Sequence, residues 1–112
     1  AAGELKHGPI ALLEPGRLVV ATITQSSLLE KTLNNLREVT ARGATVLAIC
    51  PEKLAGKVRS SVAEVLTIPD ADDWLSPLLA IIPLQLFAYC MAVARGCDVD
   101  KPRNLAKSVT VE

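Results

Sequence analysis

Aromatic residues are scarce in this chain of 112 residues, of which they make up 3%. Its core must therefore come from Leu, Ile, Val and Ala, since hydrophobic residues as a whole reach 50%. Net charge is absent as well, because twelve basic side chains balance twelve acidic ones. A neutral chain gives no electrostatic reason to expect binding to nucleic acid. The hydrophobic content excludes disorder over most of the chain, and its length fits one domain or a piece of one.

Residues that bind metals are also few. His7 is the only histidine, and the three cysteines, Cys50, Cys90 and Cys97, are odd in number and form no CxxC pair. A zinc site is therefore not expected, and no cofactor is predicted. Two of the cysteines, Cys50 and Cys90, lie in segments with a buried pattern. We predict free thiols in a reducing compartment, the cytoplasm, rather than disulfides.

The first residues do not form a signal-peptide pattern, because they are charged and contain Gly and Pro. One run, from 77 to 94, has eighteen residues without a charge, which touches the lower limit for a membrane span. Pro83, Gln85 and Tyr89 within this run argue against a span, as does the lack of a second run. We predict instead a helix that is buried in a soluble α/β protein, with neither a membrane nor nucleic acid as a partner.

Short apolar runs alternate with amphipathic ones along the chain. We predict strands over 17–23, 44–50 and 62–68, helices over about 28–42 and from 73–76 to about 95, and a short helix or loop over 52–61. Ser27 and Glu30 fit a capping box at the start of the first helix. Gly43 and Gly96 suit the ends of the two helices. Pro83 is expected to kink the second helix, because it removes one backbone hydrogen bond.

This order of elements predicts an α/β fold, a three-layer αβα sandwich around a parallel sheet. Three strands are few for such a sheet, which usually has about five or six. We therefore interpret the chain as the C-terminal part of a domain whose first strands lie elsewhere. Residues 1–97 would form the domain portion and 98–112 a separate irregular tail. An unpaired edge strand would favour a dimer.

Two clusters of polar residues are candidates for a site. The stretch GELKHGP brings together a carboxylate (Glu4), an ammonium (Lys6) and an imidazole (His7) between glycines. Histidine suits proton transfer near neutral pH and lysine suits phosphate groups, while an ordinary surface loop is the alternative. Ser26 and Ser27 follow the first strand, where α/β proteins often bind phosphate, but helix capping is the simpler interpretation.

The tail over 98–112 carries Lys101, Arg103 and Lys107 among interleaved apolar residues. Its spacing alone leaves disorder and docking as alternatives. The apolar side chains would gain by lying on a surface, and a docked tail would bring Lys107 to a definite position. Cys90, by contrast, has no electropositive neighbour in the sequence and is interpreted as a core residue.

Two stretches carry a resemblance to a known family: AGELKHGPIAL and PLQLFAYCMAVARGCDVDKPRNLAKSVTVE. The chain resembles the C-terminal end of the glutamine–fructose-6-phosphate aminotransferases, isomerizing enzymes also called glucosamine-6-phosphate synthases. The segment lengths match throughout. AGELKHGP is fairly specific to sugar-isomerase (SIS) domains, and the tail motif is specific to the synthases. One position departs from the pattern: Cys90 stands where the family often has His, which is not central to the chemistry.

The resemblance implies a role within a larger enzyme. In that family a glutaminase domain passes ammonia to two SIS subdomains, where fructose 6-phosphate is converted to glucosamine 6-phosphate in a homodimer. His7 falls on the family's active-site histidine, which is linked to opening of the sugar ring and reaches the neighbouring subunit's site. Lys107 falls on the tail lysine, which closes over the sugar and is linked to its carbonyl chemistry. The resemblance thus implies catalytic roles for His7 and Lys107, and substrate binding for Lys107.

The resemblance also marks what is missing here. The glutaminase nucleophile has no counterpart, the phosphate loop belongs to the first SIS subdomain, and the general-base glutamate lies upstream of Ala1; Glu4 has no such role. We therefore expect the chain alone to be inactive. Two alternatives stay open. One is a related SIS deglycase or deaminase of amino-sugar phosphates, which would share AGELKHGP but not the NLAKSVTVE ending. The other is a non-catalytic sugar-phosphate-binding module.

Overall fold

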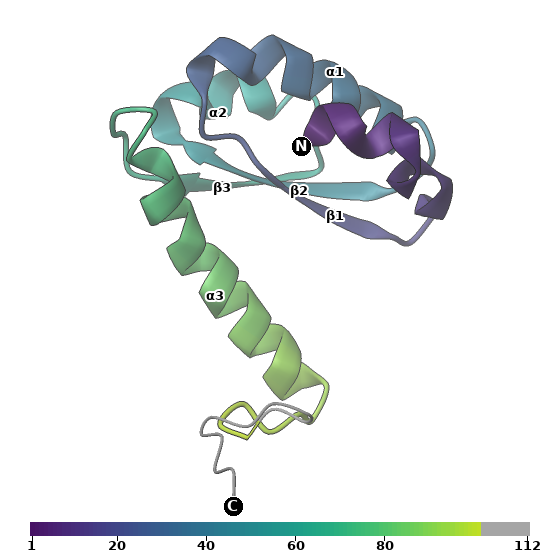
Figure 1. Cartoon of the computed structure of the whole chain (residues 1–112), viewed down its shortest axis with the longest axis vertical. Helices are drawn as coiled ribbons and strands as arrows, with labels where there is room; N and C mark the ends of the chain where they lie inside the picture. Colours follow the sequence, from purple (N-terminus) through teal and green to yellow (C-terminus); the bar gives the residue numbers. More distant parts are fainter. Residues whose placement is uncertain (102–112) are drawn as a thin grey trace, which may run out of the picture. The chain divides into compact units, whose positions relative to one another are not determined.

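The computed structural model describes residues 1–101, and the chain divides into two compact units after Ala80. Figure 1 shows the helices and strands of the chain. Among the described residues, the first unit holds β1 (Leu18–Thr22), β2 (Thr45–Pro51), β3 (Glu64–Ile68), α1 (Leu29–Thr40), α2 (Glu52–Val58) and the 3-10 helices η1 (Ala2–His7), η2 (Pro9–Leu12) and η3 (Ser26–Leu28). The last helix, α3 (Ser76–Ala94), begins in the first unit and continues into the second.

The three strands form one parallel sheet in the order β1-β2-β3. Parallel neighbours need a crossover connection, and α1 and α2 supply the two crossovers. Because successive crossovers share one hand, both helices lie on the same face of the sheet (Figure 1). The predicted α/β fold with a parallel sheet is confirmed, and each strand lies within two residues of its predicted bounds.

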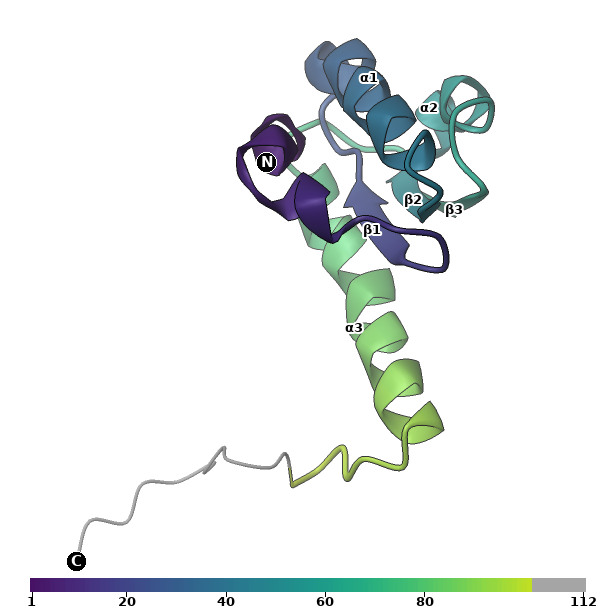
Figure 2. The same ribbon diagram turned by 90° about the vertical axis from the view of Figure 1, so that its right-hand side faces the viewer.

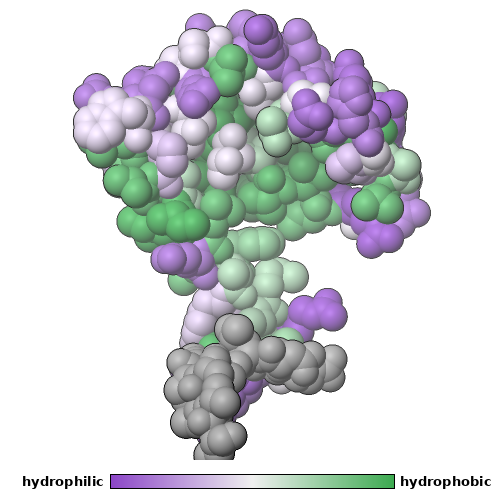
Figure 3. All heavy atoms as spheres, viewed as in Figure 1, coloured by the Kyte–Doolittle hydropathy of each residue, from purple (hydrophilic) through white to green (hydrophobic). Residues whose placement is uncertain are grey.

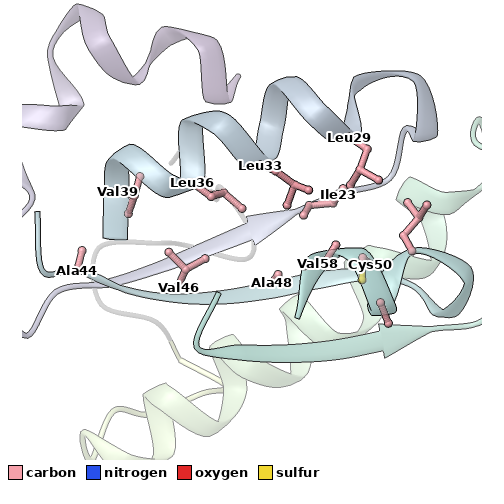
Figure 4. Close-up of a cluster of buried hydrophobic side chains, with 12 residues drawn as sticks. Ile23, Leu29, Leu33, Leu36, Val39, Ala44, Val46, Ala48, Cys50 and Val58 are labelled. Atoms are coloured by element: carbon pink, nitrogen blue, oxygen red, sulfur yellow. The ribbon is translucent and has the colours of Figure 1, made fainter. Parts of the chain in front are cut away.

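The core of the first unit lies between α1, α2 and the sheet (Figure 4). From α1 come Leu29, Leu33, Leu36 and Val39, which share one face at helical spacing and are all buried. The strands contribute alternate residues, because successive side chains point to opposite faces of a sheet. The buried cluster consists of Ile23, Leu29, Leu33, Leu36, Val39, Ala44, Val46, Ala48, Cys50, Leu54, Ala55 and Val58. Every member except Cys50 is aliphatic, as the scarcity of aromatic residues predicts.

The opposite face of the sheet is apolar too. By alternation and register, Leu18 of β1, Ile49 of β2 and Leu66 of β3 belong to this face. Ile49 is buried, but Leu18 and Leu66 remain 49% and 41% exposed. Figure 3 shows hydrophobic residues gathered on the side of the first unit opposite α1. Both faces of the strands are therefore suited to burial, as their unbroken apolar runs predict, but the first unit covers this second face only in part.

The predicted capping box is wrong. No side chain caps the N-terminus of α1, which begins at Leu29 after the 3-10 turn η3. The polar partner of this turn comes from far along the chain, since the carboxylate of Asp73 accepts hydrogen bonds from Ser26. The contact involves Ser26 rather than Ser27, and α1 begins two residues after Ser27.

Glycine ends both long helices, as predicted. Gly43 follows α1 with φ of 82°, and a Cβ there would lie 2.9 Å from Cγ of Pro15. Gly96 follows α3 with φ of 67°. Its N–H donates to the carbonyl oxygen of Val93, and the next N–H, of Cys97, donates to that of Ala92, which is the Schellman pattern. The sequence thus places the helix ends correctly because only glycine adopts this backbone freely.

The predicted burial of α3 is wrong for this chain. Within α3, Ser76 and Ala80 are the buried residues. Most of its large apolar side chains are exposed: Leu78, Ile81, Ile82, Leu86, Tyr89, Met91 and Val93. Cys90 is exposed as well, so its interpretation as a core residue is also wrong. The apolar run correctly predicts a helix, but the described residues do not pack against most of its apolar side chains.

α3 has two further features that bear on the sequence analysis. Among the helices within residues 1–101, α3 is the one that is long and apolar enough to cross a membrane. The core helix of a larger soluble protein can have the same length and composition. The helix continues through Pro83, and the kink predicted there stays a prediction. The division at residues 97 and 98 also stays a prediction, because most of the proposed tail lies outside the described residues.

Candidate functional site

His7 is the last residue of η1 and is exposed. Gly8 follows it with φ of 153° and ψ of −59°, a backbone conformation that residues other than glycine rarely adopt. η2 begins directly afterwards at Pro9. The chain therefore changes direction immediately after His7, and the imidazole stays accessible to solvent and to a ligand.

Two contacts hold η1 against the rest of the first unit. Leu5 packs against the buried cluster. Nζ of Lys6 lies 2.8 Å from Oε1 of Glu38 on α1. Figures 1 and 2 show η1 beside α1, in agreement with this ion pair. The ammonium of Lys6 is thus paired with a carboxylate of its own chain, which leaves the phosphate-binding interpretation of Lys6 without support from the structure.

A second polar group gathers where the strands end. Ser26 follows β1, Lys53 follows β2 and Asp73 follows β3, so their elements bring them to the same edge of the sheet. Asp73 accepts hydrogen bonds from the N–H of Ser26 at 2.8 Å and from its hydroxyl at 3.0 Å. Nζ of Lys53 lies 3.8 Å from Oδ1 of Asp73. The carboxyl edge of a parallel sheet is where α/β proteins bind ligands, so this group borders the expected crevice.

The loop after β3 is also tied to the start of α2. Oδ1 of Asp70 accepts a hydrogen bond from the N–H of Lys53 at 2.9 Å. A carboxylate at this position is favoured by the partial positive charge of a helix N-terminus. Nζ of Lys53 donates to the carbonyl oxygen of Ala71 at 3.2 Å. Lys53 is therefore held by two hydrogen bonds and one ion pair to residues of one loop, and the loop is fixed by residues from two strand ends.

The electrostatics of this group favour an ionised carboxylate. The backbone and hydroxyl hydrogen bonds from Ser26 lower the pKa of Asp73 below its ordinary value, and the charge of Lys53 acts in the same direction. A phosphate bound at Ser26 would meet this negative charge. The phosphate-site interpretation of Ser26 therefore has no support, and the hydrogen bonds instead join two loops.

Sequence reasoning did not identify Lys53, Asp70 or Asp73 as part of a site. The signals were present in the segments PEK after the second strand and PDADD after the third. Recognising them required the order of the strands in the sheet, since the ends of two parallel strands lie close together only when the strands are neighbours.

Other sequence candidates lie apart from these groups. Burial raises the pKa of the Cys50 thiol, which keeps it protonated at neutral pH. Cys97 and Tyr89 line an open cavity of about 830 Å³ in the second unit, together with Asp98 and Lys101. Within residues 1–101, no cluster of three or more His, Cys, Asp or Glu side chains is suited to hold a metal ion.

Lys107, the second predicted catalytic residue, lies outside the described residues. The structure therefore places His7 but does not test whether Lys107 joins it in one cavity. Glu4, the nearest carboxylate to His7 in sequence, lies in the first turn of η1. The catalytic assignment of His7 and Lys107 stays a prediction.

Comparisons with known proteins connect the whole chain to one kind of enzyme. It is 53% identical over 112 residues to the glutamine–fructose-6-phosphate aminotransferase [isomerizing] of Clostridium tetani, covering all of this chain and 18% of that protein. It is 55% identical over 112 residues to the protein of the same name from Methanosarcina acetivorans, again with 100% and 18% covered. The chain thus spans 18% of the length of these curated relatives.

Solved structures and family patterns agree with these relatives. The C-terminal domain of glucosamine-fructose-6-phosphate aminotransferase from Francisella tularensis matches with a TM-score of 0.83 and 40% sequence identity, over 90% of this chain and 28% of that one. Residues 1–95 match the SIS domain pattern. The match includes η1, with His7, and all three strands. The chain therefore belongs to the SIS domain family.

Proposed function

We propose that this chain is part of the isomerase domain of an amidotransferase that makes glucosamine 6-phosphate from fructose 6-phosphate and glutamine-derived ammonia. The observation that carries the proposal is the sequence identity of 53% and 55% to two glutamine–fructose-6-phosphate aminotransferases. Both alignments cover the whole of this chain. The 40% identical structural match, to the C-terminal domain of such an enzyme, supports the same conclusion.

The proposed reaction has three chemical requirements. Moving a proton between adjacent sugar carbons needs a base, ring opening needs an acid, and the developing enolate oxygen needs a positive group. His7 is accessible and suited to proton transfer with the ring oxygen. Lys107 would supply the positive charge. The base would come from the part of the longer protein that precedes this chain.

The exposed apolar surface supports a role within a larger protein. Leu18 and Leu66 on the sheet, and Leu78, Ile82 and Leu86 on α3, lie open in this chain. Exposed apolar surface of this kind marks interaction sites. We infer that a glutaminase domain and a first SIS subdomain of the same polypeptide complete the enzyme, that it acts as a cytoplasmic homodimer, and that the chain alone is inactive.

The test is a set of substitutions in the longer protein that contains this chain. We expect His7→Ala and Lys107→Ala to lose synthesis of glucosamine 6-phosphate from fructose 6-phosphate and glutamine by at least about a hundredfold, the usual size of a lost acid–base contribution. Lys31→Ala on the exposed side of α1 serves as the control and should keep activity. Full synthesis by the Lys107→Ala variant would contradict the role proposed for Lys107. Binding of fructose 6-phosphate without synthesis by the unchanged longer protein would instead favour a sugar-phosphate-binding module.

The chain alone gives a second test. It should form no glucosamine 6-phosphate when supplied with fructose 6-phosphate and ammonia, because the base and the phosphate loop are expected elsewhere. Measurable product would contradict the proposal that the base and the phosphate loop lie in other parts of the longer protein. A deglycase or deaminase would instead release ammonia from glucosamine 6-phosphate and would not need glutamine.

A further inference from the structure

We propose that the ion pair between Lys6 and Glu38 is a positioning device for the imidazole of His7. The inference rests on the proposed function, in which His7 takes part in catalysis. Lys6 precedes His7 directly, and its Nζ lies 2.8 Å from Oε1 of Glu38. Lys6 and Glu38 take no part in the proposed reaction, and their ion pair joins η1 to α1.

η1 needs such a contact because it has little stability of its own. It is a 3-10 helix of six residues, and no side chain caps its N-terminus. Helices of this type have poorer hydrogen-bond geometry than α-helices and form only in short pieces. On its other side lies Gly8, which adopts φ of 153° and, because glycine has no Cβ, has wide conformational freedom. His7 therefore lies between a short, uncapped helix and a permissive glycine.

Two neighbours of His7 compensate for this freedom. Leu5 packs on the buried cluster and fixes one side of η1. Lys6 fixes the other side through Glu38, which belongs to a helix whose buried face includes Leu36 and Val39. The ion pair thus connects the residue before His7 to a helix that is packed on the core of the first unit.

The carboxylate of Glu38 is available for this task. Arg42, which follows α1, donates to the backbone carbonyl oxygen of Glu38 at 2.8 Å, and Arg37 donates to Asn34 at 2.7 Å. Among the described residues, the ion pair recorded for Glu38 is the one with Lys6. The two side chains are 56% and 37% exposed, so the pair is screened by water and its effect on overall stability is small.

An alternative role for Lys6 is direct contact with a sugar phosphate. The two roles differ in what they change. A ligand contact strengthens substrate binding, so its loss raises KM, whereas a misplaced imidazole lowers kcat at nearly constant KM. Reversing both charges distinguishes them further, because a swapped pair restores the tether but places a carboxylate where a phosphate ligand would need an ammonium.

The experiment uses the longer protein with fructose 6-phosphate and glutamine as substrates. We expect Lys6→Glu and Glu38→Lys each to lower kcat for synthesis about fivefold, the most that an exposed ion pair contributes, with KM for fructose 6-phosphate within about twofold. The double swap Lys6→Glu/Glu38→Lys should recover most of the loss. The matched control is the swap Glu14→Arg/Arg17→Glu, because this exposed ion pair at 2.7 Å does not involve η1. Circular dichroism checks that all variants are folded.

Two results would overturn the inference. One is full activity in both single variants, and the other is a raised KM at constant kcat in Lys6→Glu without recovery in the double swap. His7→Ala is measured beside them to separate this inference from the proposed function. If His7→Ala loses synthesis while the charge variants behave as the control does, only the positioning role fails. If His7→Ala keeps full synthesis, the catalytic assignment of His7 fails, and the positioning role fails with it.

Discussion

Ser26 donates two hydrogen bonds to Asp73 across 47 residues of chain, one from its backbone N–H at 2.8 Å and one from its hydroxyl at 3.0 Å. This contact joins the segment after β1 to the segment that leads into α3. α1 begins shortly after this contact, at Leu29, without a side-chain cap. The carboxyl edge of the sheet is thus organised by contacts between loops, and these contacts can be tested on the chain itself.

Asp73→Asn should destabilise the first unit. The substitution removes the charge that strengthens both hydrogen bonds from Ser26 and the attraction to Lys53. We expect a lower urea midpoint of unfolding, followed by circular dichroism. Asp72→Asn is the control, because the backbone oxygen of Asp72 accepts the bonds from Leu75 and Ser76. Equal midpoints for the two variants would contradict a role of the Asp73 carboxylate.

The same contact predicts a pH dependence. The pKa of Asp73 is lowered in the folded chain, so its ionisation stabilises the fold above the unfolded value of about 3.8. That contribution is lost as the pH falls below about 3.8 through the lowered folded pKa. The difference in stability between the unchanged chain and Asp73→Asn should therefore be constant from pH 7 to about pH 5 and shrink in stronger acid. A difference that grows on acidification would have the wrong sign.

Two glycines should respond in opposite directions to alanine. Gly43→Ala forces φ of 82° on a residue with a Cβ, which would also lie 2.9 Å from Cγ of Pro15. We expect a loss of about 1 kcal/mol or more in the free energy of unfolding. Gly56 lies inside α2 with open space around it, so Gly56→Ala should be neutral or stabilise by up to about 1 kcal/mol. Urea titration of both variants measures the contrast, and equal losses would contradict it.

Two leucines test which surfaces are packed in this chain. Leu36 is 2% exposed within the core, so Leu36→Ala should cost about 2–5 kcal/mol in the free energy of unfolding. Leu86 on α3 is 62% exposed, so Leu86→Ala should change that free energy by no more than about 0.5 kcal/mol. A large loss for Leu86→Ala would mean that α3 is packed in the chain alone.

Local patterns predicted the strands, the positions of Gly43 and Gly96 and the parallel arrangement. Runs such as LVVAT and TVLAIC are short, apolar and rich in β-branched residues, and these features do not depend on distant contacts. The stretch with His7 was located from its motif. The structure places His7 at the end of η1, and its catalytic role stays a prediction.

Other features could not be predicted because they depend on distant partners. Ser26 was assigned to a helix cap or a phosphate site, while its partner Asp73 enters only through the order of the strands. The apolar composition of α3 indicated burial but could not say which surface would cover it. Lys6 was considered as a phosphate ligand because its pairing with Glu38, 32 positions further along, is visible only in the folded chain.

We propose above that this chain belongs to an enzyme that moves glutamine nitrogen onto fructose 6-phosphate. The most direct test supplies the longer protein with fructose 6-phosphate and glutamine labelled with ¹⁵N in its side-chain amide. Mass spectrometry then measures the label in the product. The account predicts glucosamine 6-phosphate that carries ¹⁵N. Absence of labelled product, together with release of ammonia from added glucosamine 6-phosphate, would contradict it and identify a deaminase instead.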